Sequence, residues 1–394
     1  MTAATPSNLQ APKKGAYHSQ WIDLLRGLSA LAVVLFHVRV DLWVGWKELR
    51  AHPDAYSTAD RLAAFLSVLA PFFGSAVMLF FLVSGFCVHF AYAAKGRPFE
   101  IGPYARRRFF RIYPPYLAIV LLTVLVGWIV SRWFGAPVAS VSTFAKSLFM
   151  VQNYGANAGQ LIGNPSLWSL PVEAELYLVY PLFLWGCSRL GYKVALALVA
   201  LTSGIALLLS LRLGASGGFN FSGNFLIYWI IWCGGAVLAE ALKRDKLPQW
   251  NLGHSLISLL LLAAAMVATL KSAPVGVGHL LWASFYFMLM LWGLARPDAV
   301  RWPDRVKAPL LWLGSISYSL YLVHFPFFYL CGAIWQHQFG SKPSNFLISL
   351  CFVLLSVPVA ALFYRFLELP SHTWARKFGA ARAVALPLAA TRAK

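Results

Sequence analysis

The chain has 394 residues, of which 59% are hydrophobic and 12% are charged, and its mean hydropathy is +0.66. This composition excludes a soluble globular domain, in which charged residues make up about 25% of the total, and it indicates a membrane protein. The formal net charge of +20 does not call for a nucleic-acid partner, because basic loops beside anionic membrane lipid account for it.

Ten apolar stretches are long enough to cross a bilayer, since a membrane-spanning helix needs about 20 residues. They lie at 21–44, 68–93, 113–134, 167–188, 192–211, 223–241, 254–270, 277–295, 309–335 and 346–367. The short alternating strands of a membrane barrel are absent. The sequence therefore predicts an all-α fold, a polytopic membrane helix bundle of about ten transmembrane helices.

Lys and Arg are unevenly distributed between alternate loops, with 22 on the side of the N-terminus and 8 on the other side. Basic residues of short loops tend to stay in the cytoplasm, so both termini are predicted to be cytoplasmic. The first span contains Arg26 and lacks a small-residue cleavage site, so no cleaved signal peptide is expected. The predicted division is an N-terminal tail at 1–18, one membrane domain at 19–370 and a basic C-terminal tail at 371–394.

Three ionisable residues interrupt the first span: Asp23, Arg26 and His37. At about 100° per residue they share one helical face, which leads from the cytoplasmic end into the membrane. The structural explanation is that Asp23 and Arg26 form an ion pair at the helix end, while His37 is a core residue with a hydrogen-bond partner. Ionisable groups at membrane depth also mark a bundle interior or a water-filled cavity, which is the functional explanation.

Two later spans contain polar stripes at a matching depth. These stripes are Ser169, Glu173, Tyr177 and Tyr180 in the fourth span, and Ser317, Tyr321 and His324 in the ninth. Each stripe alone can be explained by hydrogen bonds between helices. Three stripes at compatible depths favour one shared polar cavity. The five cysteines show no metal-ligand spacing, so no metal is expected.

A basic cluster, YARRRFFRIYPPY, precedes the third span. It can serve simply as a topology anchor. The spacing of Arg107, Arg108 and Arg111 also places guanidinium groups on one helical face, which suits phosphate. Pro114 and Pro115 predict a bend between this segment and the third span.

Together these features fit a ligand with a phosphorylated head and a long thin arm, such as acyl-coenzyme A. The head would bind the cytoplasmic arginines, and the arm would extend about 15–20 Å into the membrane towards His37. A buried neutral imidazole can take the proton of an attacking hydroxyl, and Glu173 or a tyrosine would fix its tautomer.

Several motifs in chain order resemble the membrane acyltransferase-3 family. They are WIDLLRGLSALAVVLFHV, FFLVSGF, RRFFRIYP, WSLPVEAELYLVYP, SYSLYLVHFPF and FLELP. The resemblance implies a ten-helix membrane enzyme that moves an acyl group, usually acetyl, from cytoplasmic acyl-CoA to a hydroxyl of an extracytoplasmic or lipid-linked carbohydrate. We accordingly expect a multi-pass protein of the bacterial inner membrane.

The resemblance implies that His37 is the catalytic histidine and Arg26 its motif partner. Where the family often has a second acidic residue directly after the one matched by Glu173, this chain has Ala174. The candidate residues are His37, Arg26, Asp23 and Glu173 for catalysis; Arg107, Arg108, Arg111, Ser84 and Tyr113 for acyl-CoA; and Trp168, Ser169, Tyr177, Ser317, Tyr321 and His324 for the acceptor.

The predicted mechanism uses His37 as general base for direct transfer, and a covalent acyl-enzyme is the variant. Tyr321, Ser317 and backbone donors are candidates for the oxyanion stabiliser. A transporter or flippase is the competing class, because polar stripes also line transport paths, and a sensory or scaffold membrane protein is a third. The sequence leaves open the acceptor, the acyl chain length and the oligomeric state.

Overall fold

The computed structural model describes residues 14–95, 98–154, 160–213, 223–296 and 302–375, and this part of the chain contains helices and no strand. The α-helices are α1 (Lys14–Asp41), α2 (Gly45–Ala51), α3 (Thr58–Ala64), α4 (Ala70–Phe73), α5 (Ala76–Phe90), α6 (Ile101–Phe134), α7 (Val141–Leu148), α8 (Ser169–Leu190), α9 (Tyr192–Leu213), α10 (Phe225–Lys243), α11 (Leu252–Leu270), α12 (Val275–Ala295), α13 (Asp304–Ser315), α14 (Ser317–Phe339) and α15 (Phe346–Phe363). The all-α prediction is confirmed.

Each of the ten predicted spans contains a helix, but fewer are apolar enough to cross a membrane by composition. Eight described helices pass that test, and a ninth span results if Thr58–Phe73 and Ala76–Phe90, which meet at 44°, count as one. The predicted span at 167–188 corresponds to α8, which lies outside this set because Glu173 and Glu175 make it more polar.

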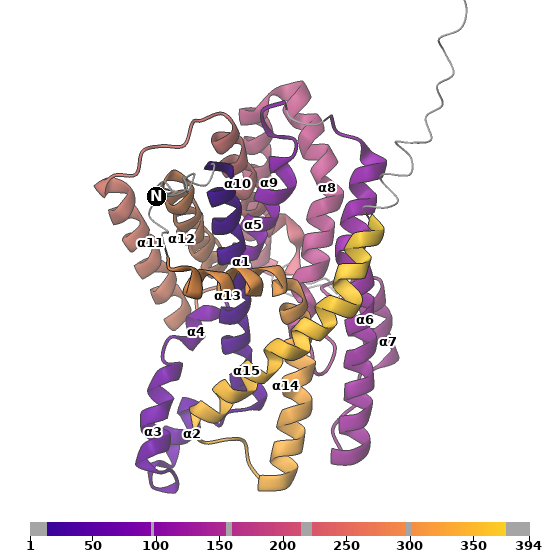
Figure 1. Ribbon diagram of the computed structural model, residues 1–394, viewed down its shortest axis with the longest axis vertical. Helices are drawn as coiled ribbons and strands as arrows, with labels where there is room; N and C mark the ends of the chain where they lie inside the picture. The colour runs from indigo at the N-terminus through magenta and orange to yellow at the C-terminus, as the bar shows by residue number, and fades with distance from the viewer. Residues whose placement is uncertain (1–13, 96–97, 155–159, 214–222, 297–301, 376–394) are drawn as a thin grey trace, which may run out of the picture.

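Helix α1 lies in the middle of the bundle and contacts α5, α13, α14 and α15 (Figure 1). Among the described helices, α5 and α10 pack against each other most extensively. Helix α1 begins at Lys14, inside the predicted N-terminal tail. The rest of that tail, and the C-terminal tail after residue 375, lie outside the described residues.

The predicted span at 309–335 starts too early, because the chain forms two helices there and the second, Ser317–Phe339, is the one long and apolar enough to cross a membrane. Helix α13 ends at Ser315 and runs across the bundle, and α14 then starts at Ser317 (Figure 1). Two close backbone contacts with α1 accompany this turn. A Cβ at Gly27 would lie 2.8 Å from the carbonyl oxygen of Leu310, and one at Gly314 would lie 2.2 Å from that of Asp23.

The basic segment and the third span do not form separate helices at Pro114 and Pro115, because α6 continues through both prolines. Proline lacks the N–H group that would bond the carbonyl four residues earlier. The carbonyl of Phe110 accepts a hydrogen bond from the Ser371 hydroxyl instead, at 2.5 Å. A side chain from the far end of the sequence thus replaces the donor that Pro114 lacks.

The described chain directly after α6 folds back along this helix. The Tyr116 hydroxyl donates to the carbonyl of Ser147 in α7 at 2.7 Å and accepts from Gln152 at 3.1 Å. Tyr116 lies about 27 Å along the helix axis from the end of α6. Helix α8 consequently begins beside the middle of α6 rather than at its outer end.

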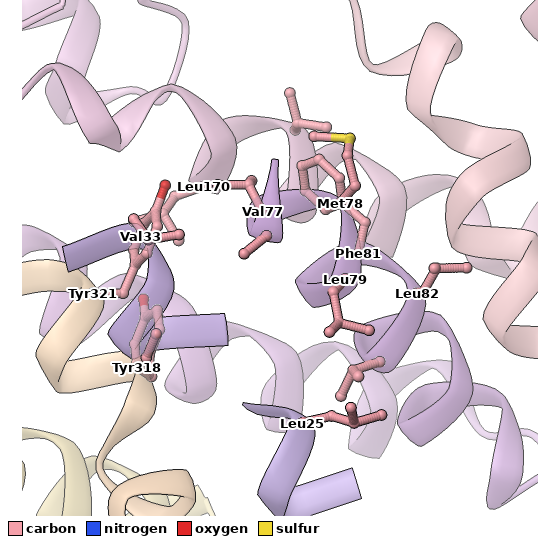
Figure 2. Packing of buried hydrophobic residues seen from close by; sticks show 14 of the residues in the cluster. Leu25, Val33, Val77, Met78, Leu79, Phe81, Leu82, Leu170, Tyr318 and Tyr321 are labelled. Carbon is pink, nitrogen blue, oxygen red and sulfur yellow. The ribbon is translucent and has the colours of Figure 1, made fainter. Parts of the chain in front are cut away.

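The apolar core is formed mainly by α1, α5, α10 and α14. Figure 2 shows Met78, Phe81 and Leu82 of α5 within this cluster, together with Tyr318 and Tyr321 of α14. Both tyrosines present their rings to the core, while their hydroxyls meet polar partners on α6 and on the segment before α8.

The close packing of α5 on α10 predicts that Gly85→Ala will destabilise the protein. A Cβ at Gly85 would lie 1.9 Å from the carbonyl oxygen of Trp232, and main chain cannot rotate away as a side chain can. Overpacking costs about 1–3 kcal/mol, and more when backbone must move. We expect a lower thermal unfolding temperature in detergent. Gly204→Ala on α9 is the control, since no heavy atom lies within 4 Å of its added Cβ. Equal unfolding temperatures for the two variants would contradict this packing.

Candidate active site

A cavity of about 340 Å³ lies between α1, α5, α6, α8 and α14 and is closed on one side by the helix that follows α15. Ten of the predicted site residues line it. They are Arg26, Ser84, Arg107, Arg108, Arg111, Ser169, Glu173, Tyr177, Ser317 and Tyr321. Six of these ten belong to the three predicted polar stripes, namely Arg26, Ser169, Glu173, Tyr177, Ser317 and Tyr321. The stripe residues Asp23, His37, Tyr180 and His324 do not line the cavity.

Four arginines give one wall of the cavity its positive charge. Arg26 lies 3.6 Å from Asp23, whose side chain is 40% exposed, and Arg107 donates to the Tyr92 hydroxyl at 3.0 Å. Arg108 lies over the Tyr177 ring, 5.2 Å from its centroid, and its buried Nε has no hydrogen-bond partner among the described residues. An anionic ligand would meet several donors at this wall.

The fourth arginine, Arg111, has a strong protein partner that sequence reasoning missed. Its guanidinium donates to Glu368 at 3.0 Å and to His372 at 2.9 Å. Glu368 is completely buried and also accepts from the main-chain N–H and the hydroxyl of Ser319, at 3.2 and 2.6 Å. The FLELP motif that contains Glu368 was the available signal, but it had been used only for the family resemblance.

A hydrogen-bonded carboxylate, Glu173, also lines the cavity. Glu173 accepts from Ser84 at 2.8 Å and from Tyr177 at 2.6 Å, and Ser84 in turn accepts from the Trp232 indole at 3.3 Å. Glu175, two residues further along α8, does not line the cavity. Its carboxylate accepts a hydrogen bond from the Tyr154 hydroxyl. Burial raises the pKa of this hydroxyl most, and the hydrogen bond to Glu175 raises it further.

The inner end of the cavity is formed by Phe80 and Tyr321, whose ring centroids lie 5.8 Å apart. The Tyr321 hydroxyl donates to the carbonyl of Ser166 and accepts from Ser169, both at 2.6 Å. Ser317 also faces the cavity, and its hydroxyl donates to the carbonyl of Gly314. Tyr321 is therefore held in place by the segment that precedes α8.

His37 and His324 do not line this cavity; they pair with each other. His37 Nδ1 lies 3.0 Å from His324 Nε2, and the two rings stack with centroids 5.1 Å apart. The His324 ring lies 5.8 Å from that of Tyr321, so one aromatic contact connects the pair to the inner end of the cavity. The expectation that Glu173 or a tyrosine fixes the His37 tautomer is wrong, because His324 occupies that position.

Three other predicted residues lie outside the cavity. Asp23 is beside Arg26, and the Tyr113 hydroxyl donates to the carbonyl of Leu148, on the side of α6 that faces α7. Trp168 stacks on His279 with centroids 5.8 Å apart and an interplanar angle of 4°. The described part of the chain contains no group of three or more His, Cys, Asp or Glu side chains suited to a metal ion.

These distances define two environments that can support one reaction. The arginine wall can bind and orient anionic groups, because guanidinium groups pair well with phosphate. The histidine pair can accept a proton, since a ring nitrogen of a neutral imidazole carries a lone pair. Tyr321 lies next to both environments.

Comparisons with known proteins are consistent with this arrangement. The chain matches the family model described as an acyltransferase domain over residues 19–365. It is 21% identical over 373 residues to peptidoglycan O-acetyltransferase OatA of Listeria monocytogenes serovar 1/2a. It is 24% identical over 378 residues to YrhL of Bacillus subtilis (strain 168), whose name assigns the same activity provisionally. Both alignments cover 89% of this chain but 55% and 54% of the relatives, so the chain spans about half their length. No solved structure matches it.

The buried ion pair predicts that Glu368→Ala will strongly destabilise the protein. Removing one partner of such a pair leaves the other uncompensated, which costs about 3–5 kcal/mol. We expect a large drop in the thermal unfolding temperature in detergent. The matched control is Asp304→Ala, because Asp304 is 91% exposed beside Lys307 and an exposed pair contributes about 0–1 kcal/mol. A Glu368→Ala protein as stable as the control would show that Arg111 does not depend on this carboxylate.

Proposed function

Because the chain belongs to the acyltransferase-3 family, we propose that it is a membrane O-acyltransferase that moves an acetyl group from acetyl-CoA to a hydroxyl of an envelope saccharide. The observation that best supports this proposal is the arrangement of the cavity, in which an arginine wall leads to Tyr321 and the buried histidine pair. The names of the two relatives, both O-acetyltransferases of peptidoglycan, support a saccharide as acceptor.

Acetyl-CoA is the donor in this proposal, and it enters from the cytoplasmic side. The cavity volume of about 340 Å³ suits the thin arm of the molecule rather than its nucleotide head. The head then lies at the mouth, where Arg107 is exposed and Arg108 presents its guanidinium. Charge-assisted hydrogen bonds to phosphate are about twice as strong as neutral ones, so these arginines provide much of the affinity.

The chemical step is general base catalysis by His37. Its imidazole takes the proton of the acceptor hydroxyl as the oxygen attacks the thioester carbonyl. A C–O bond forms, the C–S bond breaks, and the proton passes from His37 to the departing thiolate, so that coenzyme A leaves as a thiol. The acetyl end must pass Phe80 and Tyr321 to reach His37, since these rings close the cavity on that side.

The acceptor reaches His37 from the extracytoplasmic side, opposite to the donor. Both substrates then meet at one buried base, and the saccharide never enters the cytoplasm. The same arrangement accounts for a bacterial inner-membrane protein with cytoplasmic termini, in which the 22 basic residues on one side of the membrane face the cytoplasm.

The first test is coenzyme A release by the purified protein in lipid nanodiscs, with acetyl-CoA and peptidoglycan oligosaccharides supplied together. We expect acetyl groups on the saccharide and an equal amount of free coenzyme A. His37→Ala should lower kcat by about 10²–10⁴-fold, because this is the contribution of a positioned acid or base. His52→Ala is the control, as His52 lies in an exposed segment between α2 and α3.

A wild-type rate in His37→Ala would overturn the assigned base. Saccharide movement across the bilayer without coenzyme A release would overturn the transferase and favour the transporter class.

A second test concerns donor binding. Arg108→Ala should raise KM for acetyl-CoA about 10–100-fold and leave kcat nearly unchanged, because a charge-assisted hydrogen bond contributes about 1.5–3 kcal/mol to both ground and transition states. Arg132→Ala, an exposed change at the other end of α6, should have no effect. Steady-state kinetics distinguish the two constants. If kcat falls while KM stays constant, Arg108 acts in the chemical step and not in donor binding.

A further inference from the structure

The hydrogen bonds of the histidine pair determine which ring nitrogens are protonated. His324 is completely buried, and its Nδ1 lies 3.1 Å from the carbonyl oxygen of Leu320. A carbonyl oxygen can only accept a hydrogen bond, so Nδ1 of His324 must be the donor. In a neutral imidazole the other nitrogen is then an acceptor, which makes Nε2 of His324 the acceptor towards His37.

The same reasoning fixes the tautomer of His37. Its Nδ1 lies 3.0 Å from His324 Nε2 and must therefore donate to it. With the proton on Nδ1, the lone pair of His37 lies on Nε2. The Leu320 carbonyl, His324 and His37 thus form one directional series of hydrogen bonds that ends at an unprotonated nitrogen.

Aromatic packing holds both rings in this orientation. The ring of Phe36 lies 5.0 Å from that of His37 on one side, and the ring of Phe325 lies at 5.0 Å on another. His324 itself packs against Tyr321, Phe325 and Phe328. Both imidazoles therefore contact aromatic rings as well as each other.

We propose that His324 is the positioning residue of the transfer reaction and holds His37 in the tautomer whose Nε2 acts as base. This inference rests on the proposed function, because it assigns His324 a role only if His37 takes the proton of the acceptor. It differs from the expectation that His324 binds the acceptor. His324 acts through His37 and does not touch the reacting atoms.

A pair of amide substitutions tests this role. Glutamine places its terminal oxygen near the position of Nε2 and can still accept from His37, whereas asparagine is one methylene shorter and reaches only the position of Nδ1. His324→Gln should keep kcat within about tenfold of wild type. His324→Asn should lower kcat about 10²-fold or more, with KM for acetyl-CoA unchanged, because base catalysis contributes about 10²–10⁴-fold.

A direct readout is the tautomer of His37, measured by nitrogen-15 NMR on histidine-labelled protein in nanodiscs. The wild type and His324→Gln should show His37 protonated on Nδ1, and His324→Asn should show a mixture of tautomers. Thermal unfolding checks that both variants are folded. Nε2 protonation of His37 in the wild type, or a folded His324→Asn protein with the kcat of wild type, would overturn the inference.

These outcomes are separable from failure of the proposed function. If His37→Ala retains full activity, the assigned base is wrong whatever His324 does. If activity requires His37 while both amide variants keep the kcat and the tautomer of wild type, only the role of His324 is wrong.

Discussion

A guanidinium in the interior of a membrane protein requires a fixed counter-charge, and Arg111 obtains it from Glu368 at 3.0 Å. Glu368 also accepts two hydrogen bonds from Ser319, so a single carboxylate joins α6, α14 and the helix that follows α15. These three elements form much of the cavity wall. Because Arg111 is paired with Glu368 and Arg26 lies 3.6 Å from Asp23, the positive charge that remains for a ligand comes mainly from Arg107 and Arg108.

The cavity wall that contains Ser169 and Glu173 is positioned by irregular backbone before α8, which lies along α6. Such backbone is tolerated at membrane depth only where it is buried in protein or lines an aqueous cavity. Amide side chains make it possible here: Asn153 donates to the carbonyl of Trp168 at 2.7 Å, and Asn164 donates to that of Leu322 at 3.3 Å. Helix α8 therefore starts level with the middle of α6, and its first two turns present Ser169 and Glu173 to the cavity.

The sequence predicted features that depend on local periodicity, and it missed those that depend on distant partners. Apolar runs and polar stripes are local, so the helices and ten cavity-lining positions were predictable. The continuation of α6 through Pro114 was not predictable, because Ser371, far away in the chain, donates to the carbonyl that Pro114 cannot serve. The partner of His37 was also unpredictable, because Glu173 and His324 satisfy the same criterion of depth and only the packing of α14 on α1 selects between them.

The choice of a second histidine as partner affects the chemistry of His37. A carboxylate at Nδ1 would stabilise the imidazolium that forms when Nε2 takes a proton. His324 is neutral when its Nε2 accepts from His37, so it orients the base without offering a full negative charge. An imidazolium next to His324 is therefore less stabilised than one next to a carboxylate, and the proton passes readily to the departing thiolate. Tyr321 also separates His37 from the arginine wall, which limits the repulsion that an imidazolium would experience from those cations. A neutral partner and a separate anion site together favour a base that is protonated only briefly during each transfer.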